Sequence, residues 1–273
     1  MKRLKIVIIL ACASQIFCTE TSDHKQILQI SIPKAGTNLL SKCISYLTGR
    51  QSVASSLSGE GAPRIFFEIY PEEFNVLFNL PSQYFLANHL LYSPLIAKEL
   101  NKLNITTFFI YRDPRDQVIS FAFFMKNGSN YWEKTTNMTF EEVLWDLISK
   151  GSTYDSKPPI EGNIRVVYDA YLAWINEPGV CVIKFEDLVG PNGGGDKDKQ
   201  HDAIKKIAAH LGLSTNDEKV NQIAHDLFGG SWTFREGQIG SWKKYFTERH
   251  KEEFKKAAGQ LLIDLGYEKD FNW

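Results

Sequence analysis

Residues 27–40 have the sequence ILQISIPKAGTNLL and change local structure twice. The apolar run at 27–32 is typical of a buried strand, and Pro33 ends it. The chain then turns through Lys34 and Gly36 into a segment with the apolar spacing of a helix. A strand, a tight turn and a helix N-terminus in this order direct backbone N–H groups and the positive end of a helix dipole at one point. The stretch therefore predicts an anion site.

The side chains of the turn suit the same anion. Gly36 lets the backbone approach a ligand closely, Lys34 carries a mobile positive charge, and Thr37 adds a hydroxyl donor. The spacing GxxxxGK followed by Ser or Thr, which marks a nucleotide-binding P-loop, is absent. An ordinary strand–helix turn with a surface lysine is therefore an alternative for this stretch taken alone.

A second charged stretch, YRDPRDQVIS at 111–120, ends an apolar strand predicted at 106–111. The planar guanidinium of Arg112 can engage two oxygens of a terminal phosphate. Ser120 lies one to two turns into the helix that follows, where its hydroxyl can point back at the same phosphate. Taken alone, the stretch also fits a helix start with a surface ion pair.

A third stretch, FREGQIGSWKKYFT at 234–247, carries two glycines and the positive charge of Arg235 ahead of an aromatic and basic helix start. This composition fits an anion-binding loop, and a surface turn fits it equally well. His89, at the end of a strand predicted at 84–90, is the candidate general base, although a lone histidine at a strand end is more often structural.

Together the three stretches resemble the donor-binding motifs of sulfotransferases that use 3′-phosphoadenosine 5′-phosphosulfate (PAPS). The resemblance covers residues 26–270 and rests on the motifs PKxGT for the 5′-phosphosulfate, the Arg and Ser of the 3′-phosphate motif, and RKGxxGxWK. The donor-binding residues that it implies are Lys34, Ala35, Gly36, Thr37, Asn38, Arg112, Ser120, Arg235, Glu236 and Gly237.

The resemblance also implies roles in catalysis. His89 matches the family's catalytic histidine in spacing and would take a proton from a hydroxyl or amine acceptor, while Lys34 would stabilise the leaving phosphate oxygen. The implied activity is transfer of the sulfuryl group from PAPS, as co-substrate, to a small-molecule or glycan acceptor whose identity cannot be read. No metal-ligand spacing is visible, and no metal is expected.

Three of the departures from the family pattern bear on activity. Glu236 replaces a usual Lys, Ala87 replaces a common Lys, and Phe185 replaces a common Tyr. Because of them, a nucleotide-binding module that has lost catalytic activity is an alternative function. A kinase with a degenerate P-loop is a further alternative, which a requirement for Mg²⁺ and ATP would support.

Strands alternate with helices from 27–32 to a last apolar strand at 180–185. This order predicts a single α/β domain over residues 25–273, with a parallel sheet flanked by helices, and the resemblance implies the P-loop-like sulfotransferase fold. Residues 51–64 are predicted as a loop, 65–80 as a short helix and 203–211 as a helix that ends at Gly212.

The charge balance of the chain bears on its possible partners. Lys plus Arg number 31 and Asp plus Glu 32, a net charge of -1, which gives no reason to expect a nucleic acid partner.

Cys43 and Cys181 lie in apolar patterns that predict buried thiols. A C-terminal dimer motif of the family is partly matched, with Glu248 in place of a valine, so a monomer or weak homodimer is expected.

Residues 1–24 form a leader in which basic residues precede the apolar run 6–13 and small residues follow. This order is typical of a secretory signal peptide, and residues 9–12 (ILAC) also resemble a lipoprotein processing site. The run is shorter than the roughly 20 residues of a membrane-spanning helix, so stable insertion is not expected. The leader therefore predicts a secreted or extracytoplasmic protein. The alternative is a cytoplasmic protein with an uncleaved leader.

Overall fold

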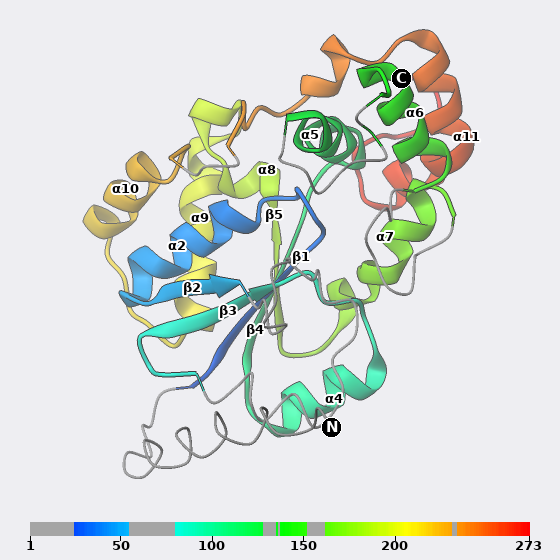
Figure 1. Cartoon of the computed structure of the whole chain (residues 1–273). Helices are drawn as coiled ribbons and strands as arrows, with labels where there is room; N and C mark the ends of the chain where they lie inside the picture. The colour runs from blue at the N-terminus through cyan, green and yellow to red at the C-terminus, as the bar shows by residue number, and fades with distance from the viewer. Residues whose placement is uncertain (1–24, 55–79, 128–134, 136, 152–161, 231–233) are drawn as a thin grey trace, which may run out of the picture.

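The computed structural model describes residues 25–54, 80–127, 135, 137–151, 162–230 and 234–273. Within these residues, five parallel strands form a sheet in the order β2-β3-β1-β4-β5 (Figure 1). The strands are β1 (Ile27–Ser31), β2 (Gln51–Ala54), β3 (Tyr84–Asn88), β4 (Thr106–Tyr111) and β5 (Val180–Lys184). The predicted α/β fold with a parallel sheet is confirmed.

Helices cover both faces of this sheet, with α2, α9 and α10 on one side and α5, α6, α7 and α11 on the other (Figure 1). The α-helices are α2 (Thr37–Thr48), α4 (Pro94–Lys102), α5 (Pro114–Asn127), α6 (Phe140–Ser149), α7 (Ile164–Leu172), α8 (Phe185–Leu188), α9 (Lys197–His210), α10 (Asp217–Asp226) and α11 (Glu248–Asp264). The 3-10 helices are η2 (Ala173–Asn176), η3 (Pro191–Gly193) and η4 (Ser241–Lys244).

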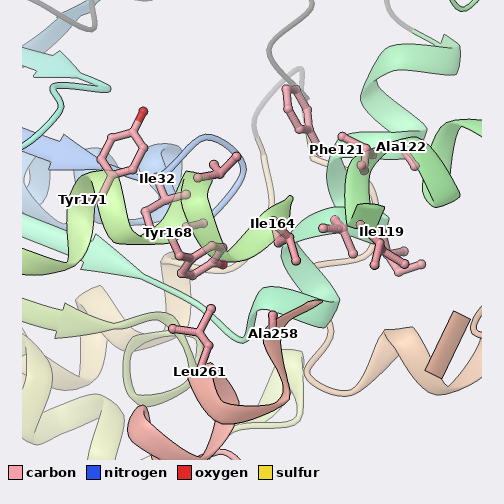
Figure 2. Packing of buried hydrophobic residues seen from close by; sticks show 14 of the residues in the cluster. Ile32, Ile119, Phe121, Ala122, Ile164, Tyr168, Tyr171, Ala258 and Leu261 are labelled. Carbon is pink, nitrogen blue, oxygen red and sulfur yellow. The ribbon is translucent and has the colours of Figure 1, made fainter. Parts of the chain in front are cut away.

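Two apolar cores lie against the two faces of the sheet. Every residue of β1 is buried, as expected for a central strand covered on both sides. Leu28 and Ile30 of β1 belong to the core on the α5 side, whereas Ile27 belongs to the core on the α2 side. Figure 2 shows part of the first core, with side chains from α5, α7 and α11 and with Ile32, the residue that follows β1, close to Tyr168 and Tyr171 of α7.

The strand order places a switch point beside β1. The chain leaves β1 through α2 for the edge strand β2, returns to β3, and then crosses through α4 to β4 on the other side of β1. In parallel α/β sheets, ligands bind at the carboxyl ends of the strands where such a reversal occurs. The loops that follow β1, β3 and β4 therefore meet at the expected ligand-binding edge.

Some element boundaries differ from the prediction. Residues 51–54, predicted as part of a loop, form β2, because the sequence QSVA pairs in parallel with β3. The helix predicted at 203–211 begins earlier, at Lys197, since the side chain of Asp196 caps it by accepting from the backbone N–H of Lys199. The helix predicted at 65–80 and the leader 1–24 lie outside the described residues.

Cys43 and Cys181 are buried free thiols, as predicted. Burial raises the pKa of both, that of Cys181 to about 11, so neither is primed as a nucleophile. Across the described ranges, no helix has the length and apolar character needed to span a membrane.

Candidate functional site

The loop between β1 and α2 is built around an unusual backbone. Lys34 and Gly36 have φ angles of 66° and 114°, in the region that favours glycine. A Cβ added to Gly36 would lie 2.9 Å from side-chain carbons of Ile110 and Phe185. Gly36 is also the N-cap of α2 and supplies no side-chain cap to it. The helix N-terminus thus faces the loop with a glycine, a geometry suited to close approach by an anion.

The Lys34 side chain lies in a group of cations. Its ammonium is 4.2 Å from the centre of the Phe124 ring. Burial, together with the positive charges of Arg112 and Arg235, lowers the pKa of Lys34 to about 8. The structure therefore brings together three predicted site residues that are far apart in the sequence, and their mutual repulsion favours an anion between them.

His89 follows β3 and faces the end of β1. Its Nδ1 lies 2.8 Å from the carbonyl oxygen of Ser31 and 3.1 Å from the Ser31 hydroxyl, which in turn lies 2.7 Å from the hydroxyl of Thr37. A carbonyl oxygen only accepts, so Nδ1 carries the hydrogen and Nε2 keeps the lone pair. The histidine is thus oriented by the strand that carries the anion loop.

The environment of His89 keeps it neutral. Burial lowers the pKa of the imidazole to about 4; the hydrogen bond to Ser31 opposes this shift, and the charge of Lys34 adds to it. A neutral imidazole with a defined free lone pair is the form that a general base requires near neutral pH.

Arg112 is buried at the end of β4. Its Nη2 donates to the backbone oxygen of Gln238 at 2.7 Å, and its guanidinium stacks 4.2 Å from the Phe185 ring. Asp116 lies 3.6 Å away as an ion-pair partner. The Nε of Arg112 is buried and has no hydrogen-bond partner among the described residues. These contacts fix the side chain, and its Nε–H remains available to a ligand.

Arg235 reaches the group from the third motif. Its guanidinium lies 4.1 Å from the Phe123 ring, and its Nη1 lies 2.7 Å from Glu236 Oε1 and 3.2 Å from the Tyr245 hydroxyl. The Arg235 Nε, like that of Arg112, is buried without a partner in the described part of the chain. Gly237 has a φ of 62°, and a Cβ there would lie 2.7 Å from the Phe234 ring.

The remaining predicted residues lie around this centre. Ala35 is buried, with its backbone N–H donating to the carbonyl of Ile32 at 3.0 Å. Asn38 is exposed in the first turn of α2, and Ser120 is half-buried in α5. The part of both side chains in ligand binding stays a prediction.

Two residues that sequence reasoning missed join the motifs. Asp116 accepts hydrogen bonds from the backbone N–H groups of Gly240 and Trp242 and from the Ser241 hydroxyl, at 2.7–3.0 Å. Gln117 donates through Nε2 to the carbonyl of Pro33 at 2.7 Å. Asp116 was visible four residues after Arg112, but nothing in the sequence pointed to partners more than a hundred residues away.

The arrangement can bind a compact anion of high charge and accept a proton beside it. His, Cys, Asp and Glu side chains of the described ranges form no group of three suited to a metal ion.

Comparison with known proteins gives a consistent picture. A family model described as a sulfotransferase domain matches residues 24–228. Sulfotransferase 6B1 of Danio rerio is 25% identical over 89% of this chain and 82% of its own, and a flavonol sulfotransferase-like protein of Flaveria bidentis is 24% identical over 93% and 86%. The crystal structure of mouse sulfotransferase SULT7A1 complexed with PAP has a TM-score of 0.65 and 20% identity, covering 89% of this chain and 87% of its own.

Proposed function

The chain belongs to the sulfotransferase family, and we propose that it transfers the sulfuryl group of PAPS to a hydroxyl or amine of a small-molecule or glycan acceptor. The observation that carries the proposal is the convergence of Lys34, Arg112 and Arg235 beside a neutral histidine. The structural neighbour crystallised with PAP, adenosine 3′,5′-bisphosphate, supports the choice of donor.

The residues fit a ligand with phosphate groups. Arg112 and Arg235 each keep a buried Nε–H without a partner in the described residues. A buried donor left without a partner is costly, and phosphate oxygens would satisfy both. The glycine-capped N-terminus of α2 offers a second anion position near Lys34. Two anion positions match a nucleotide that carries both a 5′-phosphosulfate and a 3′-phosphate.

Each side chain has a distinct task in this proposal. PAPS would supply the sulfuryl group. Lys34 and the N-terminus of α2 stabilise the charge that develops on the leaving phosphate oxygen. Nε2 of His89 accepts the proton of the attacking hydroxyl or amine. Arg112, Ser120 and Arg235 hold the 3′-phosphate away from the reacting atoms, so that their binding energy fixes position.

The departures from the family pattern are compatible with activity. Phe185 lacks a hydroxyl, but its ring stacks on Arg112 and holds it. Ala87 is buried in β3, in register with Gln29 of β1. Neither residue displaces His89 or Lys34. A module without turnover and a kinase with a degenerate loop are the competing functions, and they give different results in the test below.

The test is calorimetric titration of the full chain with adenosine 3′,5′-bisphosphate, beside Lys34→Ala and Arg112→Ala. Micromolar binding that falls sharply in Arg112→Ala supports the donor site. Transfer of sulfate from PAPS to a panel of phenols, alcohols and amines then measures turnover. Binding without transfer to any acceptor would indicate the inactive module. Binding of ATP with Mg²⁺ but not of the bisphosphate would overturn the proposal in favour of the kinase.

A further inference from the structure

Glu236 places a carboxylate inside the cation group. Its Oε1 lies 2.7 Å from Nη1 of Arg235 and accepts from the Tyr245 hydroxyl at 3.1 Å. The same Tyr245 hydroxyl accepts from Arg235 at 3.2 Å, so the three side chains form a closed triangle. A carboxylate and a phosphate use the same fork-shaped donors of arginine. Glu236 therefore occupies an N–H donor of Arg235, at Nη1, that an anionic ligand could also use.

The triangle is only partly satisfied. The second carboxylate oxygen of Glu236 is buried and has no hydrogen-bond partner in the described residues, with Lys244 no closer than 3.9 Å. Arg235 likewise keeps its Nε without a partner. Unsatisfied buried polar atoms on both sides of an ion pair make the pair easier to exchange for a better partner.

Arg235 also acts on the rest of the cation group. Its charge contributes to the lowered pKa of Lys34. The ring of Phe123 stacks on the guanidinium and fixes its plane. Arg235 can therefore change its anionic partner without leaving its place.

We propose that Glu236 competes with the 3′-phosphate of the nucleotide for Arg235 and so sets the affinity and exchange rate of the donor site. This inference rests on the proposed function. The incoming 3′-phosphate takes the Nη1 bond from Glu236, and the carboxylate takes it back when the product nucleotide leaves. This competition weakens the binding of both the donor and the product nucleotide, and it speeds product release.

The experiment compares the full-length wild type with Glu236→Gln, which removes the charge and keeps the shape. Glu99→Gln is the matched control, because Glu99 forms a similar ion pair with Lys102 at 2.9 Å on α4, at the other end of the molecule from α5 (Figure 1). Adenosine 3′,5′-bisphosphate and adenosine 5′-monophosphate are titrated into each by calorimetry. The dissociation rate of the bisphosphate is measured by stopped flow.

We expect Glu236→Gln to bind the bisphosphate about tenfold more tightly, mainly through slower dissociation, since a charge-assisted bond is freed for the ligand. Binding of the monophosphate, which has no 3′-phosphate, stays unchanged, and Glu99→Gln behaves as wild type. In an Arg235→Gln background, the effect of Glu236→Gln disappears, because it acts through that arginine.

Unchanged or weaker binding of the bisphosphate by Glu236→Gln would overturn the inference. Equal tightening for both nucleotides would overturn it too, since it would reflect a general change of charge. In these cases wild-type binding that depends on Arg112 would leave the proposed function standing. If the wild type does not bind the bisphosphate, the proposed function and the inference both fail.

Discussion

The single residue with the clearest chemical task is His89. The carbonyl of Ser31 fixes its tautomer, and burial holds its pKa at about 4, against an ordinary value of 6.5. The folded state therefore keeps the imidazole neutral through the range in which an exposed histidine would gain a proton. The imidazole can therefore accept a proton without first having to lose one.

Replacement of His89 by Ala should lower kcat at least about a hundredfold and leave the affinity for adenosine 3′,5′-bisphosphate unchanged, because the side chain acts on the acceptor. In the wild type, we expect kcat to stay level from about pH 7.5 down to about pH 5.5, since protonation of His89 begins only near its lowered pKa. A pH–rate profile with half-loss near 6.5 would contradict this assignment.

Lys34 should report ligand binding through its proton. In the free protein its pKa is about 8, and the phosphates of a bound nucleotide would favour the charged form and raise that pKa. At about pH 8.5, binding of adenosine 3′,5′-bisphosphate should therefore take up a proton, and the affinity should fall as the pH rises beyond 8.

Calorimetry at that pH in two buffers of different ionisation enthalpy measures this uptake. Lys34→Met is the control, because it cannot take up a proton at this position. Equal binding enthalpies in both buffers for the wild type would show that Lys34 does not meet the ligand.

At the level of elements, the site depends on the contact between α5 and η4. Asp116 of α5 accepts three hydrogen bonds from the start of η4, and Arg112, just before α5, donates to Gln238 in the loop that leads there. These bonds hold the segment that carries Arg235. Burial raises the pKa of Asp116, whereas the backbone N–H groups of Gly240 and Trp242 oppose this shift by favouring the charged form.

Asp116→Asn should lower the free energy of unfolding by about 2–4 kcal/mol, because an amide leaves donors of η4 and the charge of Arg112 without a buried anionic partner. Affinity for adenosine 3′,5′-bisphosphate should fall as well, since Arg235 loses its support. Denaturant unfolding and calorimetry measure the two effects. Asp169→Asn, which removes an exposed partner of Arg165, should change neither by more than about 0.5 kcal/mol.

For the molecule as a whole, the proposed ligand would bridge loops that follow different strands. The first motif follows β1, the second follows β4, and the third lies near the C-terminus. The two apolar cores on opposite faces of the sheet hold these segments, so a ligand that binds all three is bound only by the folded chain.

Adenosine 3′,5′-bisphosphate at about a hundred times its Kd should stabilise the folded chain by about 2.7 kcal/mol. For a chain of this size, that corresponds to a rise of Tm of about 5 °C in a thermal unfolding scan. Adenosine without phosphates should give no rise, and Arg112→Ala should lose most of it at the same concentration. An equal rise in Arg112→Ala would place the nucleotide elsewhere.

The sequence by itself determined the alternation of strands and helices, the parallel sheet and the three motifs. These are local signals: apolar runs at 27–32, 106–111 and 180–185 mark buried strands, and the glycine and lysine after the first run mark an anion loop. The resemblance to the family also made His89 a candidate base, through its spacing from the first loop, and that role stays a prediction.

Only the tertiary structure decided the rest. The short segment QSVA forms strand β2 because its backbone pairs with the edge of β3. Asp116 found its partners near residue 240, and Glu236 found Arg235 and Tyr245, through folding of distant segments onto one another. The neutral state of His89 came from burial, and its tautomer came from the carbonyl of Ser31. Such effects arise from desolvation and from contacts between residues far apart in the chain. The residues next to each position in the sequence do not indicate them.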